Sequence, residues 1–235
     1  KTADAYLGLA KTCSVKTNPE EALSVLANMN KQFSSEDVQF KAMVVEGLIH
    51  HESGNAEKAH EIAAELGKRV SDKKHTQDSE RALDIVQLFI ATGNKESAIA
   101  VLQKEIRSNP DNNALFQDAN KIFEQAGLGD EGAILIEALR KEAKEMMNSG
   151  VLLIREEKYE EAVKAMRSAR KVMPDNARVL FNLAHVLIVY IQKMGRTPEF
   201  IREARESLDA ADTLCPGEPR FMKLNELLNE LSSET

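Results

Sequence analysis

The amino-acid sequence predicts an all-α fold: a superhelix of about six helical hairpins, closed by a C-terminal capping helix. Three observations lead to this prediction. The 235-residue chain has 5% aromatic residues and no tryptophan, a composition that suits helices packed closely against one another. Small residues recur at a step of twelve residues, and capping residues followed by acids recur at expected helix starts. Self-similarity over 20 to 50 residues is typical of repeat arrays.

The twelve-residue step is clearest around KYEEAVKAMRSARKVMPDNA, residues 158–177. Ala162 lies twelve residues after Gly150 and twelve before Pro174. Small residues let two helices cross closely, and a proline just past a helix end stops it. The residues expected at such packing positions are Gly47, Ala59, Ala98, Gly150, Ala162, Ala169, Pro174, Ala204 and Ala211. Six anchor residues, one in each hairpin, lie 30 to 42 residues apart: Ala22, Ala59, Ala98, Gly132, Ala162 and Ala204.

Helices are expected in the following order along the chain. They cover residues 2–14, 18–32, 35–53, 55–70, 78–92, 95–108, 112–126, 130–156, 159–172, 177–194, 198–213 and 218–231. They pair into hairpins at 2–32, 35–70, 78–109, 112–140, 143–174 and 177–215, followed by a capping helix at 218–231. Since no proline interrupts residues 130–156, two successive helices should fuse there. The polar connection at 71–79 is the expected flexible point.

The starts of the second helices share a capping pattern. A capping residue precedes an acid at 18–21, 55–57, 94–96, 130–131 and 197–199. The side-chain oxygen of a capping residue accepts a hydrogen bond from a free backbone N–H, and a carboxylate is stabilised by the positive end of the helix dipole. Five similar starts indicate one repeated unit.

Two resemblances follow from these motifs. Gly150, Ala162, Ala169 and Pro174 match positions 8, 20, 27 and 32 of the tetratricopeptide repeat (TPR), so the chain resembles a TPR solenoid over residues 1–235. The stretches 4–11 (DAYLGLAK), 123–132 (FEQAGLGDEG) and 147–187 are similar to the C-terminal TPR output region of bacterial response regulators. The phospho-accepting receiver domain of that family is absent from this chain. Because the sequence does not begin with methionine, we expect the receiver upstream.

Candidate catalytic and metal-binding residues have simpler explanations. Neighbouring helical residues point about 100° apart, so His50 and His51 do not chelate one ion easily, and His60 has no ligand partner at i+4. Ser168 and Lys171 match SxxK in mid-helix, without the companion motifs of that chemistry. The acid pairs fit helix starts and solvated turns, and GLGDEG (127–132) lacks a P-loop lysine. We therefore expect no enzyme activity, no metal and no cofactor.

Charge and cysteine usage indicate the expected partners and cellular compartment of the chain. The net charge of −7 argues against nucleic-acid binding. The basic residues between 155 and 171 alternate with glutamates, as on a solvated helix face, although an anionic-lipid or nucleic-acid patch would have the same composition. Cys13 and Cys215 show no pairing pattern, which suits the cytoplasm. No apolar run is long enough for membrane insertion.

The TPR resemblance also implies where a partner binds. In such arrays the first helices line a concave groove, and positions 2, 5, 9 and 12 face into it. The corresponding residues in the last three hairpins include Gln117, Lys121, Glu124, Met147, Val151, Ile154, Arg178, Phe181, His185 and Ile188. Lys144 and Arg178 supply basic groups at position 2, but the rest of the set that grips chaperone tails is missing. The apolar members would be explained equally well as core residues under a neighbouring helix.

The leading functional hypothesis is a non-catalytic protein–protein interaction module, the output part of a two-component response regulator. Its partner would be a protein or peptide, such as a sensor kinase or another signalling protein. One alternative is a substrate platform or regulatory region of a larger enzyme. Another is a general cytosolic TPR assembly scaffold. The coding sequence upstream distinguishes the first two, since it would encode either a receiver or a catalytic motif.

Overall fold

The computed structural model describes residues 2–15, 18–69 and 79–233, in which the only regular secondary structure is α-helix. The helices are α1 (Ala3–Val15), α2 (Pro19–Gln32), α3 (Glu36–Glu52), α4 (Ala56–Arg69), α5 (Ser79–Ala91), α6 (Lys95–Ser108), α7 (Asn113–Gln125), α8 (Gly129–Arg155), α9 (Tyr159–Val172), α10 (Ala177–Met194), α11 (Pro198–Leu214) and α12 (Pro219–Ser233). The described residues contain no strand, so the all-α prediction is confirmed. Each predicted helix end lies within two residues of the observed one. The polar connection expected to be flexible lies outside the described residues except for Ser79, which begins α5.

The chain forms two compact units. The first contains residues 1–105 and 112–136, and the second contains 106–111 and 137–235. The helix predicted to fuse over 130–156 is the continuous α8, which contributes residues to both units. Each unit has its own buried core.

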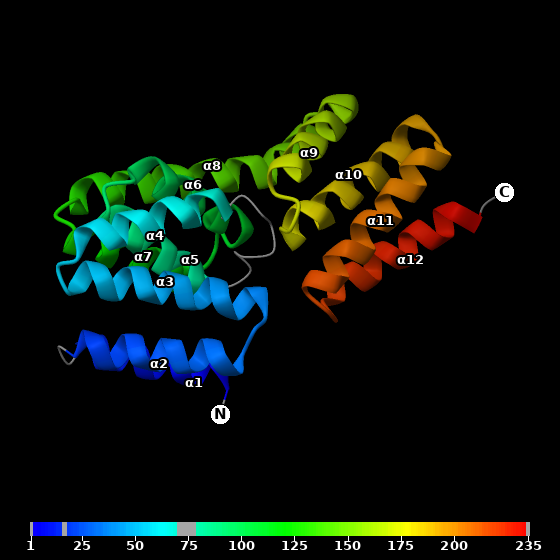
Figure 1. The fold of residues 1–235 in the computed structure, drawn as a ribbon. Coiled ribbons are helices and arrows are strands. Elements are labelled where there is room, and N and C mark those ends of the chain that lie inside the picture. The colour runs from blue at the N-terminus through cyan, green and yellow to red at the C-terminus, as the bar shows by residue number, and fades with distance from the viewer. Residues whose placement is uncertain (1, 16–17, 70–78, 234–235) are drawn as a thin grey trace. The chain divides into compact units, whose positions relative to one another are not determined.

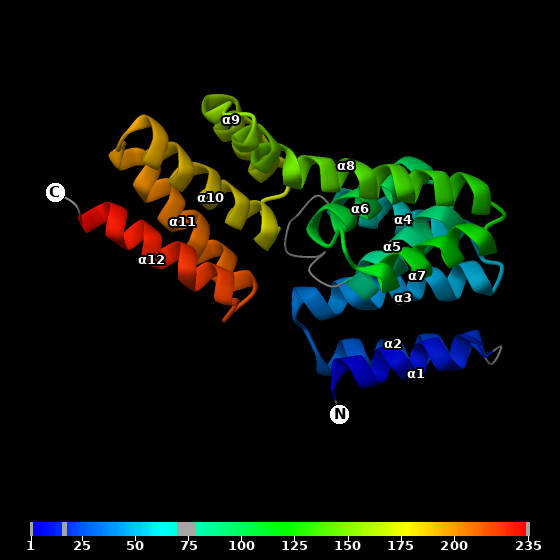
Figure 2. The same cartoon turned by 180° about the vertical axis from the view of Figure 1, so that it is seen from behind.

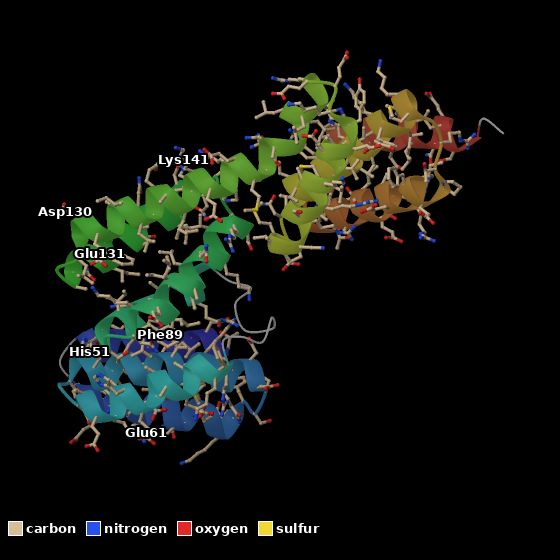
Figure 3. All side chains as sticks on the ribbon, turned by 90° about the horizontal axis from the view of Figure 1, so that it is seen from above. His51, Glu61, Phe89, Asp130, Glu131 and Lys141 are labelled. Atoms are coloured by element: carbon tan, nitrogen blue, oxygen red, sulfur yellow. The ribbon has the colours of Figure 1, made fainter. Side chains whose placement is uncertain are left out.

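In the first unit, α1 packs against α2 and α3, α3 packs against α4 and α5, and α5 packs against α7. The ribbon shows α1 and α2 running side by side (Figure 1). Ala22, Met29 and Ile49 belong to one buried cluster of this unit. Phe89 on α5 is also fully buried, whereas Glu61 on α4 faces solvent (Figure 3). The apolar stripe of each helix is thus buried against its neighbours.

The turns between first and second helices repeat one geometry. In four of them the residue five positions before the anchor has a positive φ of 60° to 80°: Gly54, Gly93, Gly127 and Glu157. The next amide then donates to the carbonyl five residues earlier, over 2.7 to 2.9 Å. This is the hydrogen bond that closes a helix in the Schellman motif, where glycine is preferred. Glu157 adopts the same conformation without being glycine, which strains its backbone.

Close helix crossings explain the recurring small residues. The six anchors are all buried, and the five alanines among them have no exposed surface. The other predicted packing residues, Gly47, Gly150, Ala169 and Ala211, are buried as well, whereas Pro174 is exposed just after α9. A Cβ atom added to Gly150 would collide with Met166, and one added to Gly132 would collide with Phe123. The chain therefore needs small residues where two helix backbones approach each other.

In the second unit, α10 packs against α9, α11 and α12, an arrangement seen from behind in Figure 2. Its core includes Met166, Leu183 and Leu228. Asn176 caps α10, since its Oδ1 accepts from the amides of Arg178 at 3.0 Å and Val179 at 3.1 Å. The Nδ2 of the same side chain donates to the Arg107 carbonyl at 2.8 Å. Asn176 therefore fixes residues 106–111 to the start of α10.

Candidate partner-binding site

The predicted groove residues of the second unit divide into surface and core. Phe181 and His185 are half-buried on consecutive turns of α10, and Val151 and Ile154 are half-buried on α8. Arg178 is exposed. These side chains retain surface that a partner could contact.

Met147 and Ile188, expected at the same groove, are fully buried and belong to the core. Asn182 of α10 donates to the Met147 carbonyl at 2.7 Å, so the two helices are in direct contact at Met147 and leave no room for a partner at that point. For these two residues, the alternative interpretation as core holds.

Three of the predicted residues come together in one place. Val151, Arg178 and Phe181 line a hollow with a volume of about 520 Å³ in the second unit. We call this the α10 hollow. Its lining also includes Asp111, Arg155, Glu218, Arg220 and Phe221. None of these five was expected at a binding site from the sequence.

The floor of the α10 hollow is aromatic. Phe221, near the start of α12, stacks on Phe181 with ring centroids 5.4 Å apart and an interplanar angle of 29°. The Arg220 guanidinium lies 5.8 Å from the centroid of the Phe181 ring, within the range of a cation–π interaction. The capping helix therefore helps to form the site.

Carboxylates are paired with basic residues at the rim of the α10 hollow. Asp111 accepts from Arg178 at 3.3 Å, and its other oxygen lies 3.9 Å from the Lys144 ammonium. Glu218 pairs with Arg220 at 2.8 Å. This hydrogen bond lowers the pKa of Glu218 and raises the pKa of Arg220, so both groups stay charged near neutral pH.

Arg155 differs from Arg178 and Arg220 in having no carboxylate partner among the described residues. It is exposed, and within the described part of the chain it forms no hydrogen bond or ion pair. The lining thus holds three arginines and two carboxylates, a local excess of positive charge in a chain of net charge −7.

His185 lies beside the α10 hollow, with its ring centroid 6.5 Å from that of Phe181. Burial lowers the pKa of His185 below its ordinary value of 6.5, because the charged imidazolium loses hydration. The ring is therefore neutral at pH 7 and presents an apolar, stacked face.

The predicted groove residues of the first unit lie along one side of α7. Gln117, Lys121 and Glu124 are all exposed. Lys121 pairs with Asp118 on its own helix at 2.8 Å, a surface contact that contributes little to stability. Glu124 also borders a shallow hollow at the α7–α8 turn. These residues form a polar stripe without an apolar floor.

A second hollow, of about 450 Å³, lies between α1, α3 and α5 in the first unit. Its apolar floor includes Leu7 and Val44. Lys11 pairs with Asp84 at 2.6 Å, and Lys41 pairs with Asp4 at 3.3 Å. Counting Ala10 and Gly47 as position 8 places several of these residues at groove positions. The repeat register of the first hairpins therefore places Leu7, Lys11 and Val44 in this hollow, whose cations are all paired.

The histidines considered as metal ligands are not assembled into a metal site. His50 lies 3.9 Å from Glu46 of its own helix, and the His60 Nδ1 lies 2.6 Å from the Ala56 carbonyl. His51 is exposed on α3 (Figure 3). Across residues 2–15, 18–69 and 79–233 there is no group of three His, Cys, Asp or Glu side chains that could hold a metal ion.

Ser168 and Lys171 are both exposed on α9, which is a second helix of its hairpin. No helix in the described part of the chain has the length and apolar character that crossing a bilayer requires. Comparison of the chain with protein-family models gave no match, and comparison with curated proteins gave none.

Proposed function

We propose that this chain is a protein–protein interaction module of the TPR type, which binds a protein or peptide partner without catalysing a reaction. The observation that carries the proposal is the α10 hollow. Val151 is contributed by α8, and Arg178 and Phe181 by α10. Aromatic and aliphatic side chains beside a few charged groups provide the two kinds of contact that binding pockets use.

Repetition supports the assignment to TPR-type hairpins. Four turns share one hydrogen-bonding geometry, and the same register predicts which small residues are buried. Repeated hairpins of this kind serve in other proteins to present extended surfaces for partners.

We further propose that the module is the output part of a cytoplasmic two-component response regulator. The resemblance of residues 4–11, 123–132 and 147–187 to that family supports this setting. The partner would then be a sensor kinase or another signalling protein. Sequencing the coding region upstream tests the setting, since a receiver domain supports it and a catalytic domain favours the enzyme-platform alternative.

Site-specific photo-crosslinking tests the binding function itself. A photoreactive amino acid replaces Arg178, at the α10 hollow, in the 235-residue chain. The matched control places it at Lys171, which is also exposed but lies on the second helix α9. In an extract of the source cells, we expect a defined crosslinked protein from position 178 and none from position 171. The same product from both positions, or no product from either, would contradict the proposal.

A further inference from the structure

We infer that the α10 hollow recognises a short partner segment in which a carboxylate lies next to an aromatic side chain. This inference rests on the proposed binding function and specifies the chemistry of the partner. The first observation is that the protein already binds a carboxylate of its own at this rim. Asp111 lies between Arg178 and Lys144, at 3.3 and 3.9 Å from their nitrogens.

Basic residues occupy similar positions on three alternate helices, α8, α10 and α12. Lys144 and Arg178 hold position 2 of the fifth and sixth hairpins, and Arg220 is the second residue of α12, as Arg178 is of α10. Internal carboxylates satisfy all three. The α10 hollow therefore has a geometry that holds acidic groups, with Asp111 and Glu218 in the places that a partner's acids would take.

Arg155 supplies the unsatisfied charge. Within the described residues it has no hydrogen bond or ion pair, and it lines the same hollow as Arg178 and Arg220. Although the chain carries a net charge of −7, charges beyond about 10 Å are largely screened at physiological salt. The local excess of arginine therefore decides the sign of the ligand, and guanidinium groups suit the planar geometry of a carboxylate.

The aromatic floor of the α10 hollow indicates which side chain of the partner lies next to its carboxylate. Phe181 and Phe221 are stacked, and Val151 lies in the same lining. A volume of about 520 Å³ accommodates one or two side chains of an extended segment, and not the face of a folded domain. An aromatic group inserted there would be the anchor of the complex, flanked by acids that reach the arginines.

The test uses a short fluorescein-labelled peptide in which glutamates flank a phenylalanine. Matched peptides carry glutamine or lysine in place of the glutamates. Fluorescence anisotropy with the 235-residue chain should show the glutamate peptide binding about tenfold or more tightly than the glutamine peptide, and the lysine peptide weakest. Higher salt should weaken the glutamate peptide selectively.

Two variants that should change the peptide affinity in opposite directions provide a further test. Arg155→Glu should weaken the glutamate peptide about tenfold or more, whereas Asp111→Asn should strengthen it severalfold by removing the competing internal carboxylate. Lys171→Glu, the same charge reversal on α9, should leave the affinity unchanged. All three residues are exposed, so melting temperatures should stay close to that of the unmodified chain.

Several results would overturn the inference. They are equal binding of the glutamate and glutamine peptides, tighter binding of the lysine peptide, competition by single-stranded DNA, or weaker binding by Asp111→Asn. If position 178 still crosslinks a cellular protein while the glutamate peptide does not bind, the interaction module stands and the acidic specificity falls. If neither is observed, both proposals fall.

Discussion

Replacing Gly132 with alanine should destabilise the first unit, although alanine is normally the better helix former. Gly132 is buried in the first turn of α8 against Phe123 of α7. An added Cβ would overlap Cβ and Cγ of Phe123 and lie 2.8 Å from its Cδ1. Carbon atoms pack best at about 3.5 to 4.0 Å, so the new methyl group would be at least about 0.7 Å too close.

The position of the clashing atom within Phe123 determines how much stability Gly132→Ala costs. Cβ of Phe123 is bonded directly to the backbone, so no side-chain rotation moves it, and α7 or α8 must shift. Overpacking of a core typically costs about 1 to 3 kcal/mol, and the alanine returns at most about 1 kcal/mol of helix propensity. The expected net effect of Gly132→Ala is a loss of up to about 2 kcal/mol.

Two other glycines of the same unit serve as controls. Gly8 lies in α1 with nothing within 4 Å of its added Cβ, so Gly8→Ala should stabilise the unit by about 0.5 to 1 kcal/mol. At Gly47 the nearest atom is Leu88 Cδ2 at 2.6 Å, the end of a flexible side chain. Gly47→Ala should therefore change the stability by an amount between those of Gly8→Ala and Gly132→Ala.

Urea titration followed by circular dichroism measures these differences. Hydrogen exchange of peptides from residues 113–125, read by mass spectrometry, assigns the transition to the first unit. Unchanged urea m-values would show that the variants differ in stability alone. If Gly132→Ala stabilised the unit as much as Gly8→Ala, the close approach of α7 and α8 would be refuted.

Three further predictions concern the second unit. Glu157→Gly should raise its stability by about 1 kcal/mol, since the positive φ of 60° costs a residue with a Cβ roughly 1 to 2 kcal/mol; an unchanged or lower thermal midpoint would contradict this. Ala162→Leu should cost about 1 to 3 kcal/mol by overpacking, whereas Lys164→Leu on the exposed face of the same helix should change the midpoint little. Because burial lowers the pKa of His185, its contribution to stability should be full above about pH 6.5 and decline as the pH falls towards the folded-state pKa. His185→Gln should flatten that part of the pH profile of the urea midpoint, and an unaltered profile would show that another group is responsible.

The helices were predictable from the sequence because their signals are local. Asn18 and Asn55, both expected as caps, accept side-chain hydrogen bonds from nearby amides at the starts of α2 and α4, and such capping involves only neighbouring residues. Thr197, also expected as a cap, makes no side-chain capping bond. The crossings at Gly150 and Ala162 were also predictable, since only small residues tolerate a close backbone approach. Even the continuous α8 follows from the absence of a helix breaker over residues 130–156.

The candidate site was only partly predictable. The repeat register indicates the face of a helix on which a side chain lies, so it identified Val151, Arg178 and Phe181. It does not indicate how near the next helix comes, which is why Met147 was expected at the surface and lies in the core.

What the sequence by itself determined is therefore the all-α class, the helix boundaries and the small residues of each hairpin. The tertiary structure alone decided the chemistry of the α10 hollow, where Arg178 meets Asp111 from 67 residues away and Phe221 of the capping helix covers Phe181. Capping, periodicity and residue size act over a few neighbouring residues. Ion pairs and ring stacking between distant segments depend on the packing of whole helices, which no local pattern encodes.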